Sequence, residues 1–92
     1  MGHYSMIDPI LYSWARSRTL HVYTVYQDYD VRSIEIESPG GAQCQLWLDR
    51  PDKNGNTIVH VWDRKNRSKK LSADIETLEN VLEDAYQQTL QW

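Results

Sequence analysis

Apolar residues recur along the chain with two different periods, and these periods predict its secondary structure. Near the start, Ile10, Leu11 and Trp14 fall on one side of a helix. The preceding Asp8-Pro9 pair is typical of a helix start, because Asp can cap the first turn and Pro suits the first helical position. We therefore expect a short helix from about Pro9 to Ser17.

The middle of the chain has the features of four β-strands. Strict alternation of apolar and polar residues is clearest where Ile34 and Ile36 are interleaved with Glu35 and Glu37. Short connections rich in Asp, Gly and Asn separate the strands and favour hairpins, so we expect an antiparallel meander. The predicted strands are Leu20–Gln27, Val31–Ser38, Ala42–Asp49 and Thr57–Asp63.

The last part of the chain has the strongest helical pattern. Ser72 is the expected N-cap, and Asp74 lies where the helix dipole favours an acid. Arg64–Leu71 is then a loop that leads into this helix. The apolar residues at helical spacing are Ile75, Leu78, Val81, Leu82, Ala85, Tyr86 and Leu90.

Together these elements predict a single α+β domain over residues 1–92 with the order αββββα. Two helices with apolar stripes can both be buried on one face of the sheet, which makes a two-layer sandwich with the other sheet face open. Residues 1–5 are expected to lie outside the fold or to derive from a tag, and Met1-Gly2-His3 is given no role.

Alternation also assigns side chains to the two faces of the predicted sheet. Residues such as Ile34, Cys44 and Val59 should face the helices. The open face could bind a protein or a second copy, because Trp and Tyr dominate binding hot spots. Alternatively, its aromatic rings could only shield the sheet. The open face is expected to carry Tyr23, Trp47, His60 and Trp62, beside Glu35 and Gln45.

Charge is distributed unevenly in a chain whose formal net charge is −3. Five basic residues lie between Arg64 and Lys70, whereas the part from Ser72 onward has five acids and no Lys or Arg. Acids at these helical spacings repel one another, so local helix energetics do not explain them. We therefore regard Glu76, Glu79, Glu83 and Asp84 as a candidate surface for a basic partner.

The basic segment could instead bind phosphates, with exposed aromatic rings stacking on bases. The order of elements is loosely similar to that of double-stranded RNA-binding domains. However, this chain has an extra strand and an acidic final helix, and its negative charge opposes phosphate binding. A solvated loop is the favoured interpretation of Arg64, Lys65, Arg67, Lys69 and Lys70.

Catalytic chemistry has little support in this sequence. Cys44 with His60 could form a nucleophile and base, and Glu35 with His60 could exchange protons. Cys44, however, occupies an inward position, where a free cysteine behaves as a small hydrophobe. No metal-ligand spacing or phosphate-binding loop is recognisable, so we expect neither an enzyme nor a cofactor or metal. A single cysteine and no long apolar run favour a cytoplasmic location without membrane contact.

The pattern resembles the small bacterial immunity proteins that accompany toxins. The resemblance rests on the Trp-containing first helix (ILYSW), the Trp-containing strands and the closing acidic helix (LSADIETLENVLEDAYQQTLQW). It implies stoichiometric binding to a toxin domain, often a basic nuclease. We therefore expect a protein-binding module of the immunity type. The alternatives are a domain that forms homodimers through its open sheet face, and a nucleic-acid-binding domain that uses residues 64–70.

Overall fold

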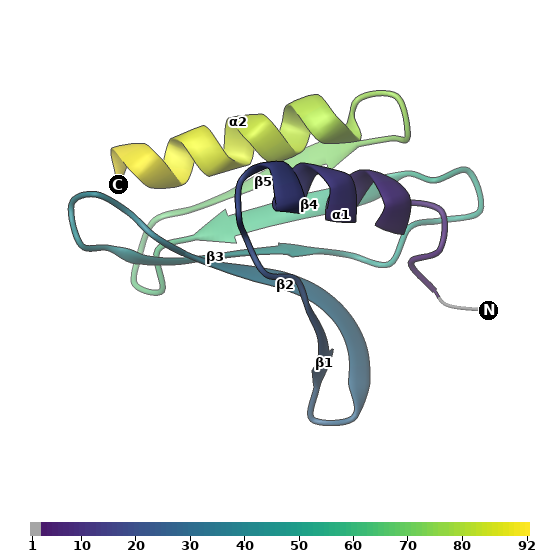
Figure 1. Ribbon diagram of the computed structural model, residues 1–92, viewed down its shortest axis with the longest axis horizontal. Helices are drawn as coiled ribbons and strands as arrows, with labels where there is room; N and C mark the ends of the chain where they lie inside the picture. Colours follow the sequence, from purple (N-terminus) through teal and green to yellow (C-terminus); the bar gives the residue numbers. More distant parts are fainter. Residues whose placement is uncertain (1–2) are drawn as a thin grey trace.

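Two helices lie on one face of a five-stranded antiparallel sheet in the computed structural model, which describes residues 3–92 (Figure 1). The strands follow one another in chain order across the sheet, from β1 at one edge to β5 at the other. This confirms the α+β class and the antiparallel meander, but the expected number of four strands is wrong. The elements are α1 (Asp8–Ser17), β1 (Tyr23–Tyr26), β2 (Tyr29–Glu37), β3 (Gln43–Leu48), β4 (Thr57–Trp62), β5 (Ser68–Ala73) and α2 (Leu78–Gln91).

The fifth strand lies in the segment that we expected to be a loop. β5 pairs with β4 so that Leu71 is opposite Val59 and Lys70 is opposite His60. Asp63 closes the intervening turn, because its Oδ1 accepts hydrogen bonds from the backbone N–H groups of Lys65 and Arg67. Lysines are uncommon in strands, yet they suit an edge strand because their charge prevents pairing with other chains.

The start of α1 is fastened by an ion pair instead of an Asp cap. Ile7 is the N-cap, and Asp8 belongs to the first turn of the helix. Its carboxylate receives two hydrogen bonds from Arg32, of 2.8 Å to Oδ1 and 2.9 Å to Oδ2. Tyr4 is buried against the Arg32 guanidinium, 4.5 Å from ring centroid to Cζ. The expectation that residues 1–5 lie outside the fold is therefore wrong for Tyr4, while Met1 and Gly2 lie outside the described residues.

α2 begins later than its apolar pattern suggested. Ser72 is part of β5, opposite Ile58, so it is not the N-cap. The chain first makes a turn closed by Asp74, whose Oδ1 accepts hydrogen bonds from the N–H groups of Glu76 and Thr77. Thr77 is the N-cap, and Leu78 is the first helical residue. Glu76 therefore precedes the helix.

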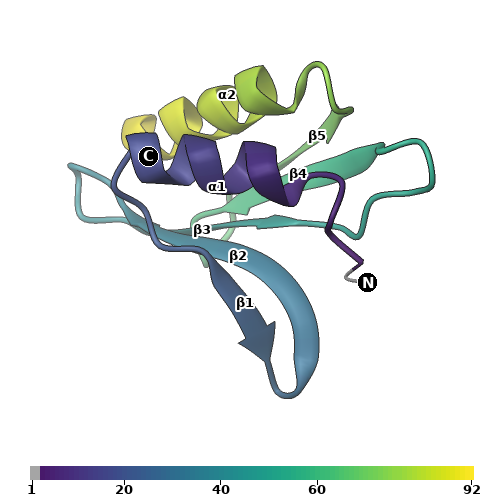
Figure 2. The same ribbon diagram turned by 45° about the vertical axis from the view of Figure 1, so that its right-hand side comes forward.

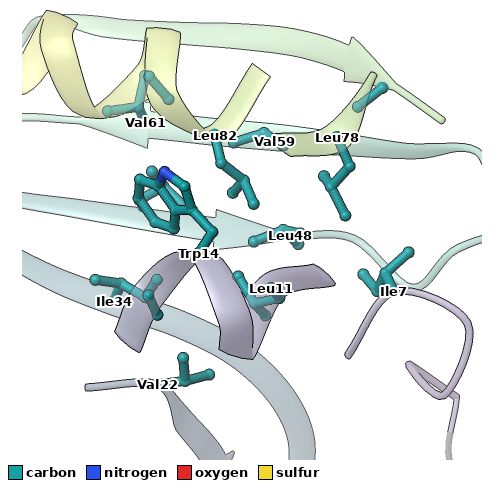
Figure 3. Packing of buried hydrophobic residues seen from close by; sticks show 14 of the residues in the cluster. Ile7, Leu11, Trp14, Val22, Ile34, Leu48, Val59, Val61, Leu78 and Leu82 are labelled. Atoms are coloured by element: carbon teal, nitrogen blue, oxygen red, sulfur yellow. The ribbon is translucent and has the colours of Figure 1, made fainter. Parts of the chain in front are cut away.

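The core lies between the helices and the sheet, as the alternation predicted. Inward side chains from β2, β3 and β4 meet Leu11 and Trp14 of α1 and Leu82 of α2 (Figure 3). The predicted inward positions Ile34, Cys44 and Val59 are confirmed by their burial. Their neighbours on the same face are also buried: Val22, Ile36, Leu46, Leu48 and Val61.

The β1–β2 hairpin projects from the sheet on the side away from both helices (Figures 1 and 2). β2 curves strongly, and the register shifts between the Tyr23 and Val25 pairs, which marks a β-bulge. Gln27 and Asp28 form the turn with φ of 49° and 70°, although neither is a glycine. β1 is shorter than the predicted Leu20–Gln27, because only Tyr23–Tyr26 pair with β2.

Candidate functional site: a groove on the open sheet face

The sheet face opposite the helices contains a concave site, which we call the open-face groove. Its volume is about 870 Å³. The curvature of β2 and the projecting hairpin form one wall, so the concave shape follows from the bulge and its added twist. The groove is lined by Tyr23, Val25, Tyr26, Val31, Ser33, Glu35, Gln45, Trp47, Trp62 and Arg64.

Strand register places the groove residues in rows across the sheet. Ser33 of β2 is opposite Trp47 of β3, which is opposite His60 of β4. In the next row, Gln45 lies between Glu35 and Trp62. Three of the four aromatic residues predicted for this face, Tyr23, Trp47 and Trp62, therefore line one groove. His60 lies beside Trp47 on the same face but outside the groove lining.

The aromatic rings hold one another in fixed positions. The Trp47 and His60 rings stack with centroids 4.7 Å apart and planes 3° from parallel. Trp62 meets Trp47 edge to face at 6.0 Å. The Trp62 indole N–H donates a hydrogen bond of 3.0 Å to Gln45 Oε1, and His60 Nε2 lies 2.9 Å from Asp49 Oδ1. Rings held in this way lose little conformational freedom when a partner binds.

One ion pair borders the groove and leaves its lining electrically balanced. Arg64, in the β4–β5 turn, contacts the Glu35 carboxylate on β2. Arg64 adopts a left-handed backbone with φ of 66°, which is uncommon for a residue other than glycine. No other charged residue lines the groove among residues 3–92. The Glu35–His60 contact that was considered for acid–base chemistry is not formed, since Glu35 pairs with Arg64 and His60 with Asp49.

The hairpin adds groove residues that the sequence did not single out. Val25 is 67% exposed and Tyr26 is 64% exposed, and both line the wall formed by β1. The apolar character of β1 on both faces was a signal for them, but alternation could not assign them to a face. Arg64 was predicted only as part of a basic loop, and no sequence pattern indicated its contact with Glu35.

The predicted acidic surface is divided by the structure. Glu83 faces α1, where its Oε1 accepts hydrogen bonds from Trp14 Nε1 at 3.0 Å and Arg18 Nε at 2.8 Å. Burial acts to raise the pKa of Glu83, but hydrogen bonds from Gln87, Trp14 and Arg18 outweigh it and hold the pKa below its ordinary value. Glu83 therefore joins the two helices. Glu76, Glu79 and Asp84 remain exposed on the helical side of the molecule, away from the groove.

The predicted basic segment is also partly engaged within the fold. Arg64 pairs with Glu35, and Arg67 Nε donates a hydrogen bond of 2.7 Å to the buried Asp63. The Arg67 guanidinium also lies over the Trp92 ring, 5.4 Å from its centroid. Lys65, Lys69 and Lys70 are exposed, so the cationic surface is smaller than the sequence suggested.

The cysteine and histidine considered as a catalytic pair are on opposite faces of the sheet. Cys44 is buried beneath the helices, whereas His60 stacks on Trp47 on the open face. Burial raises the pKa of the Cys44 thiol, which disfavours the reactive thiolate. The arrangement cannot transfer a proton directly from Cys44 to His60.

Comparison of the chain with protein-family models, curated proteins and solved structures gave no significant match. Across residues 3–92, neither helix is long and apolar enough to span a membrane.

Proposed function

We propose that this chain is a protein-binding module whose docking surface is the open-face groove. The observation that carries the proposal is a concave, aromatic-lined surface on the one sheet face that no helix covers. Trp and Tyr are the residues most enriched at binding hot spots, and the lining includes Tyr23, Trp47 and Trp62.

The shape of this face favours binding over simple shielding. Aromatic rings that only shield a sheet need no concave site beside them, whereas here a groove of about 870 Å³ is lined by Trp47 and Trp62 together with residues of the β1–β2 hairpin. Tyr23 is 47% exposed at its edge. The balanced charges of Glu35 and Arg64 favour a neutral contact segment on the partner, with an apolar side chain entering the groove.

In its most specific form, the proposal is that the chain neutralises a toxin domain by stoichiometric binding. The resemblance to immunity proteins motivates this form, and the negative charge of the chain supports it. Glu76, Glu79 and Asp84 lie on the side opposite the groove. Their field would accelerate the approach of a basic partner, while the groove would supply the contact energy.

Nucleic-acid binding has weaker support in this geometry. Two of the five basic residues expected to grip phosphates are paired with acids of the chain itself. A salt-dependent shift of RNA or DNA in a gel by the purified protein would reverse this order of preference.

The proposal is tested by purifying the tagged chain from its native host and identifying the proteins bound to it. The expected result is a partner that forms a one-to-one complex when both proteins are purified separately and remixed. If this partner has a toxic activity, the complex should suppress it at equimolar ratio. A partner that fails to bind the purified chain, or recovery of the chain alone, would contradict the proposal.

A further inference from the structure

We propose that the open-face groove binds a proline-rich segment of the partner in the polyproline II conformation, with one proline ring held between Tyr23 and Trp47. This inference rests on the proposed function for the location of the docking surface, and it adds the chemistry of the segment that docks there. The observation behind it is a row of residues that strand pairing places across the sheet face: Tyr23, Ser33, Trp47 and His60.

Trp47 presents one ring face to the groove. Its other face is covered by His60, because the two rings are 3° from parallel with centroids 4.7 Å apart. His60 belongs to β4, so the uncovered face of Trp47 points the opposite way, toward β2. The residue opposite Trp47 on β2 is Ser33, whose side chain is too short to cover an indole ring. Trp47 and Ser33 both line the groove.

Tyr23 forms a second wall on the other side of Ser33. It is opposite Ser33 on β1 and also lines the groove. Two strand spacings, or about 10 Å, therefore separate the backbones of Tyr23 and Trp47. A flat ring in contact with a ring on each side needs about 7–8 Å between the two outer rings. The hairpin bends toward the open side, which brings the walls closer together than their backbones (Figure 2). This space, which we call the Ser33 slot, fits one ring.

The charges of the groove lining favour an uncharged occupant. Glu35 is the one carboxylate in the described lining, and it already pairs with Arg64. A cationic side chain in the slot would lack an unpaired counter-charge, and removing a charge from water without one is costly. An anionic segment would be repelled by the net charge of −3. The slot therefore suits a neutral ring.

The polar groups of the lining favour proline over other neutral residues. Gln45 Oε1 accepts the hydrogen bond of the Trp62 indole, and the Glu35 carboxylate is paired, so these acceptors are engaged. The hydroxyls of Tyr23 and Ser33 can both donate hydrogen bonds. A proline-rich segment offers backbone carbonyls to such donors and has few N–H groups that require an acceptor. The donors of the groove and the acceptors of the segment are thus complementary.

The polyproline II helix presents a proline-rich segment in a suitable form. It has three residues per turn and rises about 3.1 Å per residue, so prolines on the same side are about 9 Å apart. One ring can therefore enter the slot while the neighbouring carbonyls remain at the groove surface. This conformation exists before binding, so little conformational freedom is lost on docking. Aromatic-lined grooves are a common docking site for such segments.

The inference is tested by NMR titration of the isotope-labelled protein with a blocked proline octapeptide. The peptide should shift the amide signals of Tyr23 and Ser33 and the indole N–H signal of Trp47. A glycine–serine octapeptide of the same length is the matched control and should leave these signals unchanged. Absence of shifts at millimolar peptide, equal shifts with both peptides, or shifts confined to another surface would overturn the inference.

Two variants test the wall formed by Tyr23. Tyr23→Ala removes one side of the slot and should weaken binding of the proline octapeptide at least about fivefold. Tyr12→Ala, at an exposed position of α1, is the control and should bind like the wild type. Circular dichroism checks that both variants are folded. Equal affinities of the folded variants for the peptide would contradict the slot.

Failure of this inference can be distinguished from failure of the proposed function. If the purified partner loses affinity in Ser33→Arg but is not displaced by the proline octapeptide, the groove is the docking surface and the inference of a proline-rich occupant is wrong. If the partner binds Ser33→Arg as tightly as the wild type, the proposed function itself fails. Displacement of the partner by the octapeptide, together with its loss of affinity in Ser33→Arg, is the expected result.

Discussion

The indole N–H of Trp14 donates a 3.0 Å hydrogen bond to Oε1 of Glu83, which joins the two helices above the sheet. The same oxygen receives Arg18 Nε at 2.8 Å, and Trp14 also meets the Tyr86 ring edge to face. Glu83, one of the four acids predicted to form a surface for a basic partner, is thus part of the packing of α1 on α2.

Removing this carboxylate should weaken the fold. Glu83→Ala leaves the partly buried Trp14 N–H without its acceptor, and we expect a loss of about 1 kcal/mol in the free energy of unfolding after allowing for the exposure of Arg18. Urea denaturation measures this change. Glu79→Ala is the matched control on the exposed side of α2 and should change stability by less than about 0.5 kcal/mol. Equal losses in the two variants would contradict the role assigned to Glu83.

Arg32 connects α1 to the projecting hairpin, and its replacement should reduce the free energy of unfolding more than the replacement of Glu83. Only 7% exposed, it contacts Asp8 through two hydrogen bonds and Asp30 through one of 2.6 Å. Arg32→Met leaves both carboxylates unpaired, and we expect a loss of about 2–3 kcal/mol because both are only partly buried.

Arg32→Lys is the matched test of geometry. Lysine keeps the charge but cannot make the paired contact with Asp8, so it should recover only part of the lost stability. If urea denaturation showed that Arg32→Lys is as stable as the wild type, a positive charge alone would be sufficient to stabilise this site.

Two glycines with left-handed backbones should differ in how much stability is lost when each is replaced by alanine. Gly55 has φ of 85°, and an added Cβ would lie 2.6 Å from Ile75 Cγ1. Gly41 has φ of 89° with no atom within 4 Å of that position. Gly41→Ala should therefore cost about 1 kcal/mol for backbone strain alone, and Gly55→Ala about 2–3 kcal/mol. Thermal unfolding of both variants compares these costs, and equal losses would contradict the close packing at Gly55.

Asp63, in the β4–β5 turn, should make the stability of the protein depend on pH. The hydrogen bond from the Arg67 side chain, aided by backbone N–H groups, lowers the pKa of Asp63 from 3.8 to about 2. The pKa of this carboxyl is lower in the folded state than in the unfolded state. Its ionised form therefore stabilises the fold fully at pH values above the unfolded-state pKa, and this contribution is lost as the pH falls through the folded-state pKa. Wild-type stability should therefore decline as the pH falls from about 4 to about 2.

Asp63→Asn isolates this contribution, because it removes the charge while keeping one acceptor oxygen. The variant should be less stable at neutral pH and should lose less stability in the acid range. Asp28→Asn, at the exposed hairpin turn, is the control and should follow the wild type. Denaturation at several pH values provides the comparison, and identical acid profiles for wild type and Asp63→Asn would refute the assignment.

Much of the fold could be predicted because the central strands alternate regularly. Ile34, Leu46 and Val59 identify the buried face without structural information, since one sheet face must meet the apolar helices. β5 escaped prediction because edge strands tolerate polar residues. Lys69 and Lys70 carry no apolar pattern, and only their pairing with Val61 and His60 reveals a strand.

The candidate site was predictable only where neighbouring strands share a regular register. Trp47 and Trp62 could be placed on the open face by counting residues along the strands. The bulge near Tyr23 and the curvature of β2 depend on tertiary packing, so the wall formed by Val25 and Tyr26 could not be foreseen. The position of Arg64 similarly depends on a turn conformation that no local pattern specifies.

The most direct test of the central claim compares one substitution at two places on the same sheet face. Ser33→Arg adds a long charged side chain to the groove lining, between Tyr23 of β1 and Trp47 of β3, whereas Ser72→Arg adds the same side chain on β5 outside the groove. Isothermal titration with the purified partner should show binding lost or weakened at least about tenfold in Ser33→Arg, equivalent to about 1.4 kcal/mol, and retained in Ser72→Arg. Equal affinity of both variants and the wild type would contradict binding through the open-face groove.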